Sequence, residues 1–343
     1  MRISFILGIF AEEKYFTMPN KLSTPSPLRT GGYKKTTKHF FERSKLFDAQ
    51  ITDLFDGFWP TITALKNLRW QVIGYHEMYN VPNNVDLRNK FVENNDVTNR
   101  PNLYRTFIDE DWNITEERLV QNLLINLFAC YEGWCEDITR ILSIQRSKKT
   151  LQAVSDDNFV SFFSANQILP NHTITTCYYN QFKSRCKLYN LALLNNWMNV
   201  YRYFKECRNV IVHNGGVVTQ KVVDQQVIIS AFTIYDLGLK EIPEIFPLVV
   251  GENLKLSLRG VVGFSQIIRN LVANFDVEMI KFSKAEQYYL QTLKTTFPVE
   301  YNTDPLRYKN QIQYISSQCH FGIVPKVHLN LLYRFLQQNN IMR

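Results

Sequence analysis

The chain has 343 residues, of which 45% are hydrophobic, 14% aromatic and 20% charged, so it has ample material for a globular core. Its formal net charge of +8 at pH 7 favours a polyanionic partner. Beyond the first residues, no apolar run approaches the roughly twenty residues that a membrane span needs, so we expect no membrane partner.

The N-terminal residues, 1–42, have the composition of a basic tail, which we expect to be disordered. They begin with a short apolar run that lacks the cleavage pattern of a signal peptide, so we expect a cytoplasmic protein. Met18 is an alternative start. Contact between the tail and RNA phosphates is the alternative to a plain disordered tail.

Helical spacing of apolar residues begins at Phe41 and continues past Pro60, which predicts a first long helix with a kink at the proline. Residues 80–102 interrupt this pattern with asparagines and predict a loop. A second long helix is predicted to begin at Asn113, whose side chain would cap it while Glu116 reaches back in a capping box.

A third long helix is predicted to begin near Tyr189 and to end at Asn214-Gly215-Gly216, because glycine just after the last turn is a common helix stop. The β-branched and aromatic residues at about 217–235 then predict a β-hairpin. A further helix is expected over about 253–282, and two short helices are expected in a C-terminal extension, 295–343.

Arg208, Asn209 and His213 lie in the last turns of the third helix, where a permanent cation, an amide and an imidazole are grouped closely. At about 100° per residue, Asn209 and His213 lie within about 40° of each other, whereas Arg208 is about 140° from His213. One helix therefore presents an incomplete group, and two copies that meet across a two-fold axis would complete it.

These residue types suit the cleavage of RNA without a metal, in which the 2′-OH attacks the neighbouring phosphodiester. Histidine has an ordinary pKa of about 6.5 and can transfer the proton, while arginine can hold the charged phosphorane. Asn209 can hold the histidine tautomer or donate to a phosphate oxygen. The alternative is that Arg208 and His213 are structural, because cations are favoured at the C-terminal end of any helix.

The string Arg208-Asn209-x-x-x-His213 resembles the R-N-x-x-x-H signature of the HEPN superfamily of helical RNases, and the order of elements over 43–294 is similar to that of HEPN domains. The resemblance implies an all-α, HEPN-type helical bundle with a small hairpin insertion, which forms a homodimer with its active cleft at the interface. It also implies an endoribonuclease that needs no metal or cofactor and leaves a 2′,3′-cyclic phosphate.

The resemblance further implies a role as a toxin or abortive-infection effector in phage defence, and it leaves room for an antitoxin or another regulatory partner. The alternative is a non-catalytic HEPN-like module that binds RNA or a protein. Some HEPN toxins carry a modified tyrosine where this chain has Gly215, which puts that type of pairing in doubt.

HEPN domains often place a carboxylate on an earlier helix near the catalytic arginine. Glu132 borders the apolar stripe of the second predicted helix and is the candidate for this position, whereas Asp137 and Glu136 are less well placed. A solvated glutamate at the edge of the helix is the alternative interpretation of Glu132.

No second site is predicted elsewhere. The six cysteines are scattered without metal-ligand spacing, which argues against zinc and favours a reducing compartment. The other histidines, which also lack a ligand partner at metal spacing, are His39, His76, His172, His320 and His328. The tyrosines near the motif, whose helical spacing favours the core over stacking on RNA bases, are Tyr178, Tyr179, Tyr201 and Tyr203.

Overall fold

The computed structural model describes residues 38–80, 83–92, 100–142, 173–297 and 307–342. In these ranges the protein is helical and contains no strand, which confirms the predicted all-α class. Within the same ranges, no helix combines the length and the apolar character needed to cross a membrane.

The α-helices are α1 (Glu42–Tyr79), α2 (Asn84–Phe91), α3 (Trp112–Ile141), α6 (Asn180–Arg185), α7 (Leu194–His213), α8 (Gln220–Ser230), α9 (Ile234–Leu237), α10 (Leu258–Met279), α11 (Ser283–Thr296), α12 (Tyr308–Gln318) and α13 (Leu329–Gln338). Short 3-10 helices occupy Leu191–Leu193 and Lys326–His328, and short π-helical turns occupy Arg105–Asp109 and Thr175–Tyr179.

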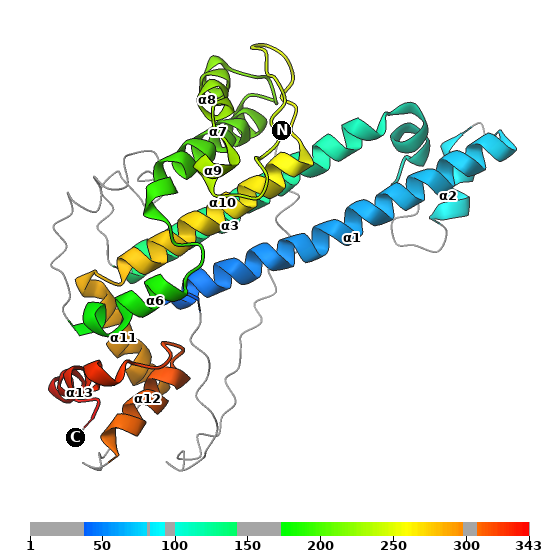
Figure 1. The fold of residues 1–343 in the computed structure, drawn as a ribbon. Coiled ribbons are helices and arrows are strands. Elements are labelled where there is room, and N and C mark those ends of the chain that lie inside the picture. Colours follow the sequence, from blue (N-terminus) through cyan, green and yellow to red (C-terminus); the bar gives the residue numbers. More distant parts are fainter. Residues whose placement is uncertain (1–37, 81–82, 93–99, 143–172, 298–306, 343) are drawn as a thin grey trace.

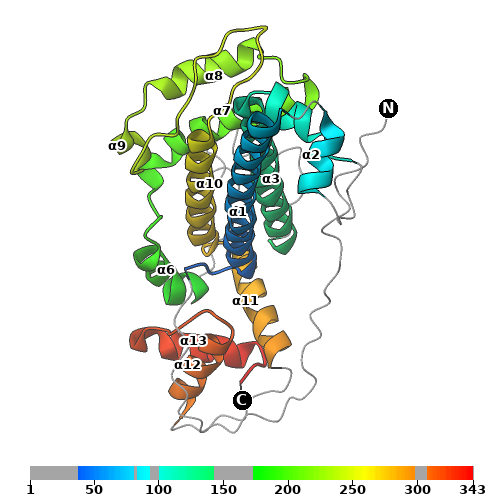
Figure 2. The same cartoon turned by 90° about the vertical axis from the view of Figure 1, so that its right-hand side faces the viewer.

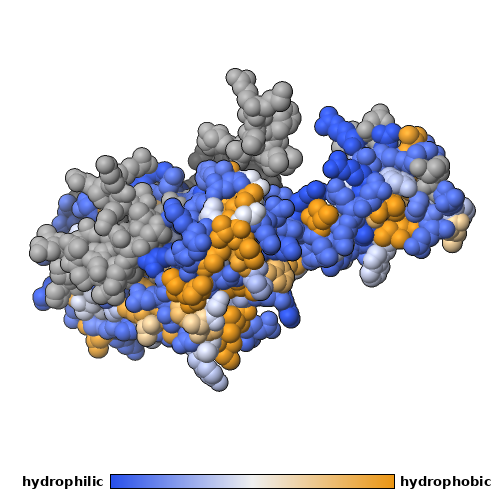
Figure 3. Space-filling model, turned by 90° about the horizontal axis from the view of Figure 1, so that it is seen from above, coloured by the Kyte–Doolittle hydropathy of each residue, from blue (hydrophilic) through white to orange (hydrophobic). Residues whose placement is uncertain are grey.

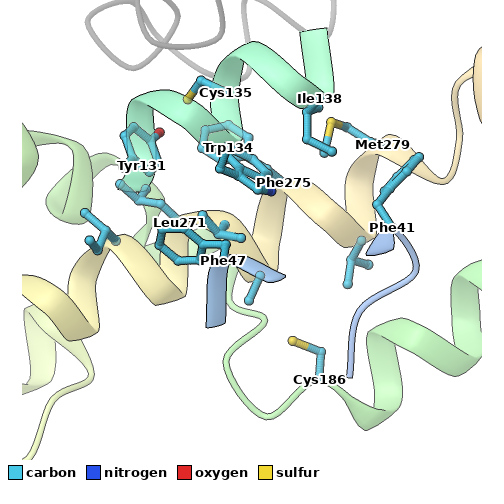
Figure 4. Close-up of a cluster of buried hydrophobic side chains, with 14 of the residues drawn as sticks. Phe41, Phe47, Tyr131, Trp134, Cys135, Ile138, Cys186, Leu271, Phe275 and Met279 are labelled. Carbon is cyan, nitrogen blue, oxygen red and sulfur yellow. The ribbon is translucent and has the colours of Figure 1, made fainter. Parts of the chain in front are cut away.

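The centre of the molecule is a bundle in which α1, α3 and α10 run side by side and α7 packs on α10 and α3 (Figures 1 and 2). Buried side chains from three of these helices meet in its core, including Phe47 of α1, Trp134 of α3 and Phe275 of α10 (Figure 4). Each such side chain contributes about 1.5–3 kcal/mol when it is fully buried. The core therefore fixes the positions of α3 and α7, which carry the candidate site.

Helix α1 continues through Pro60 as one element and extends beyond the end of α10 to form an arm with α2 (Figure 1). A small separate cluster of buried side chains holds the arm together: Val72, Leu87, Val92, Leu103 and Phe107. The predicted loop at 80–102 is wrong in part, because it contains α2. The Asn83 side chain caps this helix by accepting from the backbone N–H groups of Val85 and Asp86.

Helix α3 begins one residue earlier than predicted and uses a different cap. Asp111, rather than Asn113, accepts from a backbone N–H group, and the donor is Asn113 itself. Glu116 accepts from Trp112 Nε1 at 2.9 Å instead of completing a capping box. The capping residue is therefore Asp111, two residues before the predicted cap Asn113.

The predicted β-hairpin at about 217–235 is wrong, since this segment forms α8 and α9. The buried residues Val222 and Ile229 are seven apart, which places them on one face of α8 against α7, so tertiary packing overrides the β-propensity of the valines and isoleucines. Only one isolated antiparallel bridge occurs in the described residues, between Val217 and Asn253.

The last residues of the predicted disordered tail are ordered, which corrects its boundary; the rest of the tail lies outside the described residues. Phe40 and Phe41 are buried, and their backbone N–H groups donate to the fully buried carboxylate of Asp276 at 2.6 and 3.1 Å. His39 Nε2 lies 2.9 Å from Oδ2 of Asp48. A buried carboxylate needs such donors, so Asp276 anchors the start of α1 to α10.

The two short helices predicted near the C-terminus are present as α12 and α13. Phe321, between them, packs its ring 4.9 Å from that of Phe40 and 4.6 Å from that of Tyr289. The Tyr178 hydroxyl donates to Ser316 Oγ at 2.9 Å. The core of this extension is thus continuous with that of the bundle.

Candidate functional site

The last turn of α7 ends at His213, as the sequence predicts. The backbone N–H groups of Asn214 and Gly216 both donate to the carbonyl of Val210 at 3.0 Å. Gly215 and Gly216 have φ of 62° and 85°, in the left-handed region that favours glycine. The chain turns away directly after His213, so the imidazole lies on an exposed helix end.

Arg208 reaches from α7 to α3, where Glu132 lies. One of its terminal nitrogens, Nη2, lies 3.2 Å from each carboxylate oxygen of Glu132, and the other, Nη1, donates to Asn209 Oδ1 at 3.3 Å. The two charged side chains are 26% and 29% exposed. The structure thus brings together three of the four predicted site residues and leaves part of this polar group open to solvent.

His213 lies apart from these three residues. It is five residues after Arg208, which corresponds to about 7.5 Å along the helix axis and about 140° around it. No hydrogen bond or ion pair joins the imidazole to another residue in the described ranges. Because α7 is helical as far as His213, this spacing places the imidazole and the guanidinium on different faces of the helix in one copy of the chain.

The support beneath the site is aromatic and rigid. Tyr131 of α3 and Tyr201 of α7 are fully buried, with ring centroids 5.3 Å apart, and Phe128 packs against Tyr201 at 5.6 Å. These contacts fix α3 against α7 near the Glu132–Arg208 pair. The Tyr201 ring is therefore unavailable for stacking on RNA bases, in line with its helical spacing.

The other tyrosines near the motif are also occupied by the protein. Tyr178 and Tyr203 are buried, while the hydroxyl of the half-buried Tyr179 donates to Glu278 at 2.9 Å. Cys207, next to Arg208, is buried too, and burial raises its pKa to about 12. A buried thiol that is protonated at neutral pH is a poor nucleophile.

The sequence predicts no metal site at the remaining histidines. One of them, His172, lies outside the described residues. Among the residues that are described, no cluster of three or more histidine, cysteine, aspartate or glutamate side chains could hold a metal ion. His39, which lies within the predicted basic tail, is 4% exposed and pairs with Asp48, so it is structural.

A second polar group, which the sequence does not indicate, lies at the other end of α7. Lys187, Lys240 and Arg259 line a cleft together with Trp59 of α1. These residues come from four separate segments and form no motif. No local signal in the sequence could have identified them, since only the fold brings them together.

Exposed apolar side chains surround the end of α7. Val212 and Val217, on either side of His213 in the sequence, are 48% and 41% exposed. Others lie on α8 and on the segment that returns to α10: Val227, Ile228, Phe246, Val249 and Val250. Figure 3 looks down on the face where α8 lies, and hydrophobic atoms form a band near its middle. Such a surface is typical of an interaction site.

Comparison of the chain with models of known protein families, with curated proteins and with solved structures finds no match.

Proposed function

We propose that the protein is a metal-independent endoribonuclease of HEPN type, with Arg208 and His213 as its catalytic residues. The observation that carries this proposal is the arrangement at the end of α7, where a half-buried arginine is held by a carboxylate and an amide, and an exposed histidine follows five residues later on the same helix. The string of residues that resembles the HEPN signature supports the assignment, and the net charge of +8 fits an RNA substrate.

In the proposed reaction, the 2′-oxygen of the RNA forms a bond to phosphorus as the bond from phosphorus to the 5′-oxygen breaks. A histidine accepts the proton of the 2′-OH, and the imidazolium so formed returns a proton, directly or through water, to the departing 5′-oxygen. The products are a 2′,3′-cyclic phosphate and a 5′-OH. Arg208 would stabilise the charge on the phosphorane, for which its permanent planar cation is suited.

Glu132 and Asn209 would act as positioning residues. A free arginine side chain has many rotamers, and fixing it in advance lowers the entropy lost when the phosphate binds. The contact of Nη2 with both oxygens of Glu132 and the bond from Nη1 to Asn209 provide that restraint.

The proposed site is shared by two copies of the chain. Because Arg208 and His213 diverge by about 140° on α7, a phosphate held by one copy's Arg208 would be served by a histidine of the second copy. The exposed apolar side chains beside His213, Val212 and Val217, supply a surface that a second copy would cover.

The catalytic proposal is tested by incubating the purified full-length protein with total RNA in EDTA and analysing the ends of the fragments. We expect cleavage in EDTA with 2′,3′-cyclic phosphate ends, and losses of about a hundredfold or more for His213→Ala and for Arg208→Ala. Arg202→Ala, on the same helix, is the matched control. Cleavage that requires a metal, or that survives both substitutions, contradicts the proposal.

The dimer is tested separately by sedimentation of Val212→Asp. A charge beside His213 is expected to weaken self-association and to lower cleavage with it. Val85→Asp places the same charge on a side chain that is 51% exposed on the arm, and it should leave both properties unchanged. If the wild-type protein is monomeric and still cleaves RNA, the proposal that two copies share the site is contradicted.

A non-catalytic module is the second candidate, and one observation favours it. The guanidinium of Arg208 is already bonded to Glu132 and Asn209, so it can serve simply to join α7 to α3. In that case the wild-type protein would bind RNA or a protein partner without cutting RNA, and Arg208→Ala would lower stability while His213→Ala changes nothing.

A further inference from the structure

A cleft of about 920 Å³ lies between α1, the start of α7, α10 and the segment that follows α9. Figure 2 shows α9 and this segment on the side of α10 that faces away from α3. The cleft is separate from the Glu132–Arg208 pair, because neither residue lines it. Its apolar walls include Leu193 and Trp197 of the α7 region and Val262 of α10. The volume is in the range of small-molecule sites.

One wall of the cleft is formed by the segment after α9, which approaches α10 closely at two glycines. A Cβ on Gly263 would lie 3.0 Å from Cγ of Pro243, and one on Gly260 would overlap the carbonyl oxygen of Glu244. The segment after α9 can therefore lie directly against α10. The hydroxyl of Ser257 donates to the Glu244 carboxylate and fixes the same wall.

Three cations line the cleft: Lys187, Lys240 and Arg259. All three are exposed, and none forms an ion pair with any residue that the structure describes. The lining also contains two carboxylates, of which that of Glu244 is bonded to Ser257. Cations that approach one cleft from three segments without a protein partner favour an anionic ligand.

Trp59 offers an aromatic surface to the cleft. Its side chain is 43% exposed, and its ring stacks on Phe55 at 5.9 Å, which holds it in place. Large exposed aromatic side chains can stack on flat rings and attract cations. Because the cations here belong to the protein, a flat ring on the ligand is the partner that suits this wall.

Two side-chain amides at the cleft can form hydrogen bonds with the edge of such a ring. Gln266 Nε2 donates to Asn270 Oδ1 at 2.8 Å. This bond leaves Gln266 Oε1 as an acceptor and Asn270 Nδ2 as a donor, and neither atom has another partner in the described residues. Asn270 is 4% exposed, so a ligand donor or acceptor that reaches it would be largely shielded from water.

We propose that this cleft binds a small ligand that combines a planar aromatic ring with a phosphate or carboxylate group. The ring lies against Trp59, the anionic group is held by Lys187, Lys240 and Arg259, and the amides of Gln266 and Asn270 bond to the edge of the ring. The proposal is independent of RNA cleavage, because none of these residues belongs to the site at the end of α7.

Calorimetric titration of the full-length protein with four probes tests both halves of the ligand. AMP and indole-3-acetate have a ring and an anionic group, adenosine has only the ring, and inorganic phosphate has only the charge. We expect AMP or indole-3-acetate to bind at least about tenfold more tightly than adenosine and phosphate. Because these two probes differ in both the ring and the anionic group, the one that binds shows which combination of ring and anion the cleft accepts. If none binds, or if adenosine or phosphate binds as tightly, the proposal is wrong.

Two pairs of variants locate the binding. Lys240→Glu is expected to weaken binding about tenfold or more, while Lys221→Glu, the same charge change on exposed α8, should not. Trp59→Ala should weaken binding similarly, while Trp70→Ala, on the same helix and 73% exposed, should not. If Trp59→Ala also lowers the unfolding temperature, the lysine pair decides. Equal losses within each pair place the ligand elsewhere and overturn the assignment.

Discussion

Arg208 on α7 contacts both carboxylate oxygens of Glu132 on α3, each at 3.2 Å, across 76 residues of sequence. Both side chains are about a quarter exposed, so solvent screens their attraction. The pair therefore fixes the direction of the guanidinium more than it stabilises the fold.

The variant Glu132→Gln should distinguish a role in positioning Arg208 from a role in stabilising the fold. We expect the free energy of unfolding to fall by about 1 kcal/mol or less, because the pair is partly exposed. RNA cleavage should fall by a larger factor, since Arg208 loses its fixed direction. Asp137→Asn, which also removes an ion-pair partner on α3, is the control and should leave cleavage unchanged. Equal cleavage by the two variants would remove Glu132 from the proposed site.

Stability should decrease as the pH rises above about 6.5, the ordinary pKa of histidine. Burial alone would lower the pKa of His39, but its hydrogen bond with Asp48 and the charges of Asp276 and Asp48 outweigh burial and raise it. A group whose pKa is raised on folding stabilises the protein below its unfolded pKa, and that contribution is lost as the pH passes the folded pKa. Burial also raises the pKa of Asp276, so its contribution to stability likewise falls as the pH rises, beginning above the ordinary aspartate pKa of about 4.

Urea denaturation of wild type and His39→Gln between pH 6 and pH 9 measures this effect. The wild-type free energy of unfolding should fall over this range, and that of His39→Gln should fall less. Asp48→Asn should act like His39→Gln, because it removes the hydrogen-bond partner that holds the histidine. Parallel curves for the three proteins would show that His39 does not carry the pH dependence.

The protein should unfold in one cooperative transition that includes the C-terminal helices, because Phe321 shares its aromatic cluster with Phe40 and Tyr289. Phe321→Ala should lower the free energy of unfolding of the whole chain by about 3–5 kcal/mol. Tyr235→Ala, at a position 84% exposed, should change it by less than about 0.5 kcal/mol. Two separate calorimetric transitions would show that the extension folds on its own.

Cys130 should be the first of the six cysteines to react with a thiol reagent. It is the only one of them that is not buried, although partial burial still raises its pKa. Burial raises the pKa of Cys177 and of Cys207 to about 12, which leaves almost no thiolate at neutral pH. Cys130→Ser should therefore abolish the fast phase, and the fast phase should quicken as the pH rises.

The long helices were predictable because their buried faces repeat at three- and four-residue steps, and the end of α7 was predictable from its two glycines. Helices α8 and α9, which stand where a hairpin was predicted, were not predictable. Residues such as Val222 favour strands in isolation, whereas here packing against α7 decides the conformation. Local pattern fails where a contact distant in sequence decides the conformation.

The candidate sites show the same division. Arg208, Asn209 and His213 are close in sequence, so their spacing could be analysed on one helix. The contact of Arg208 with Glu132 was suggested by a family resemblance, whereas nothing local indicated that Asp276 would anchor Phe40, 236 residues earlier. The cations and the tryptophan of the cleft have no sequence relationship at all.

The bridge between Val217 and Asn253 has a consequence for the chain between them. The N–H of Leu254 donates to the carbonyl of Gly216 at 2.8 Å, so the polypeptide leaves α7 and returns toward α10 through a single narrow neck. Backbone contacts at this neck hold the turn that carries His213, so substitutions on the exposed faces of α8 and α9 can leave that turn in place. The interaction surface could therefore diversify in evolution while the polar group beside it stayed in place.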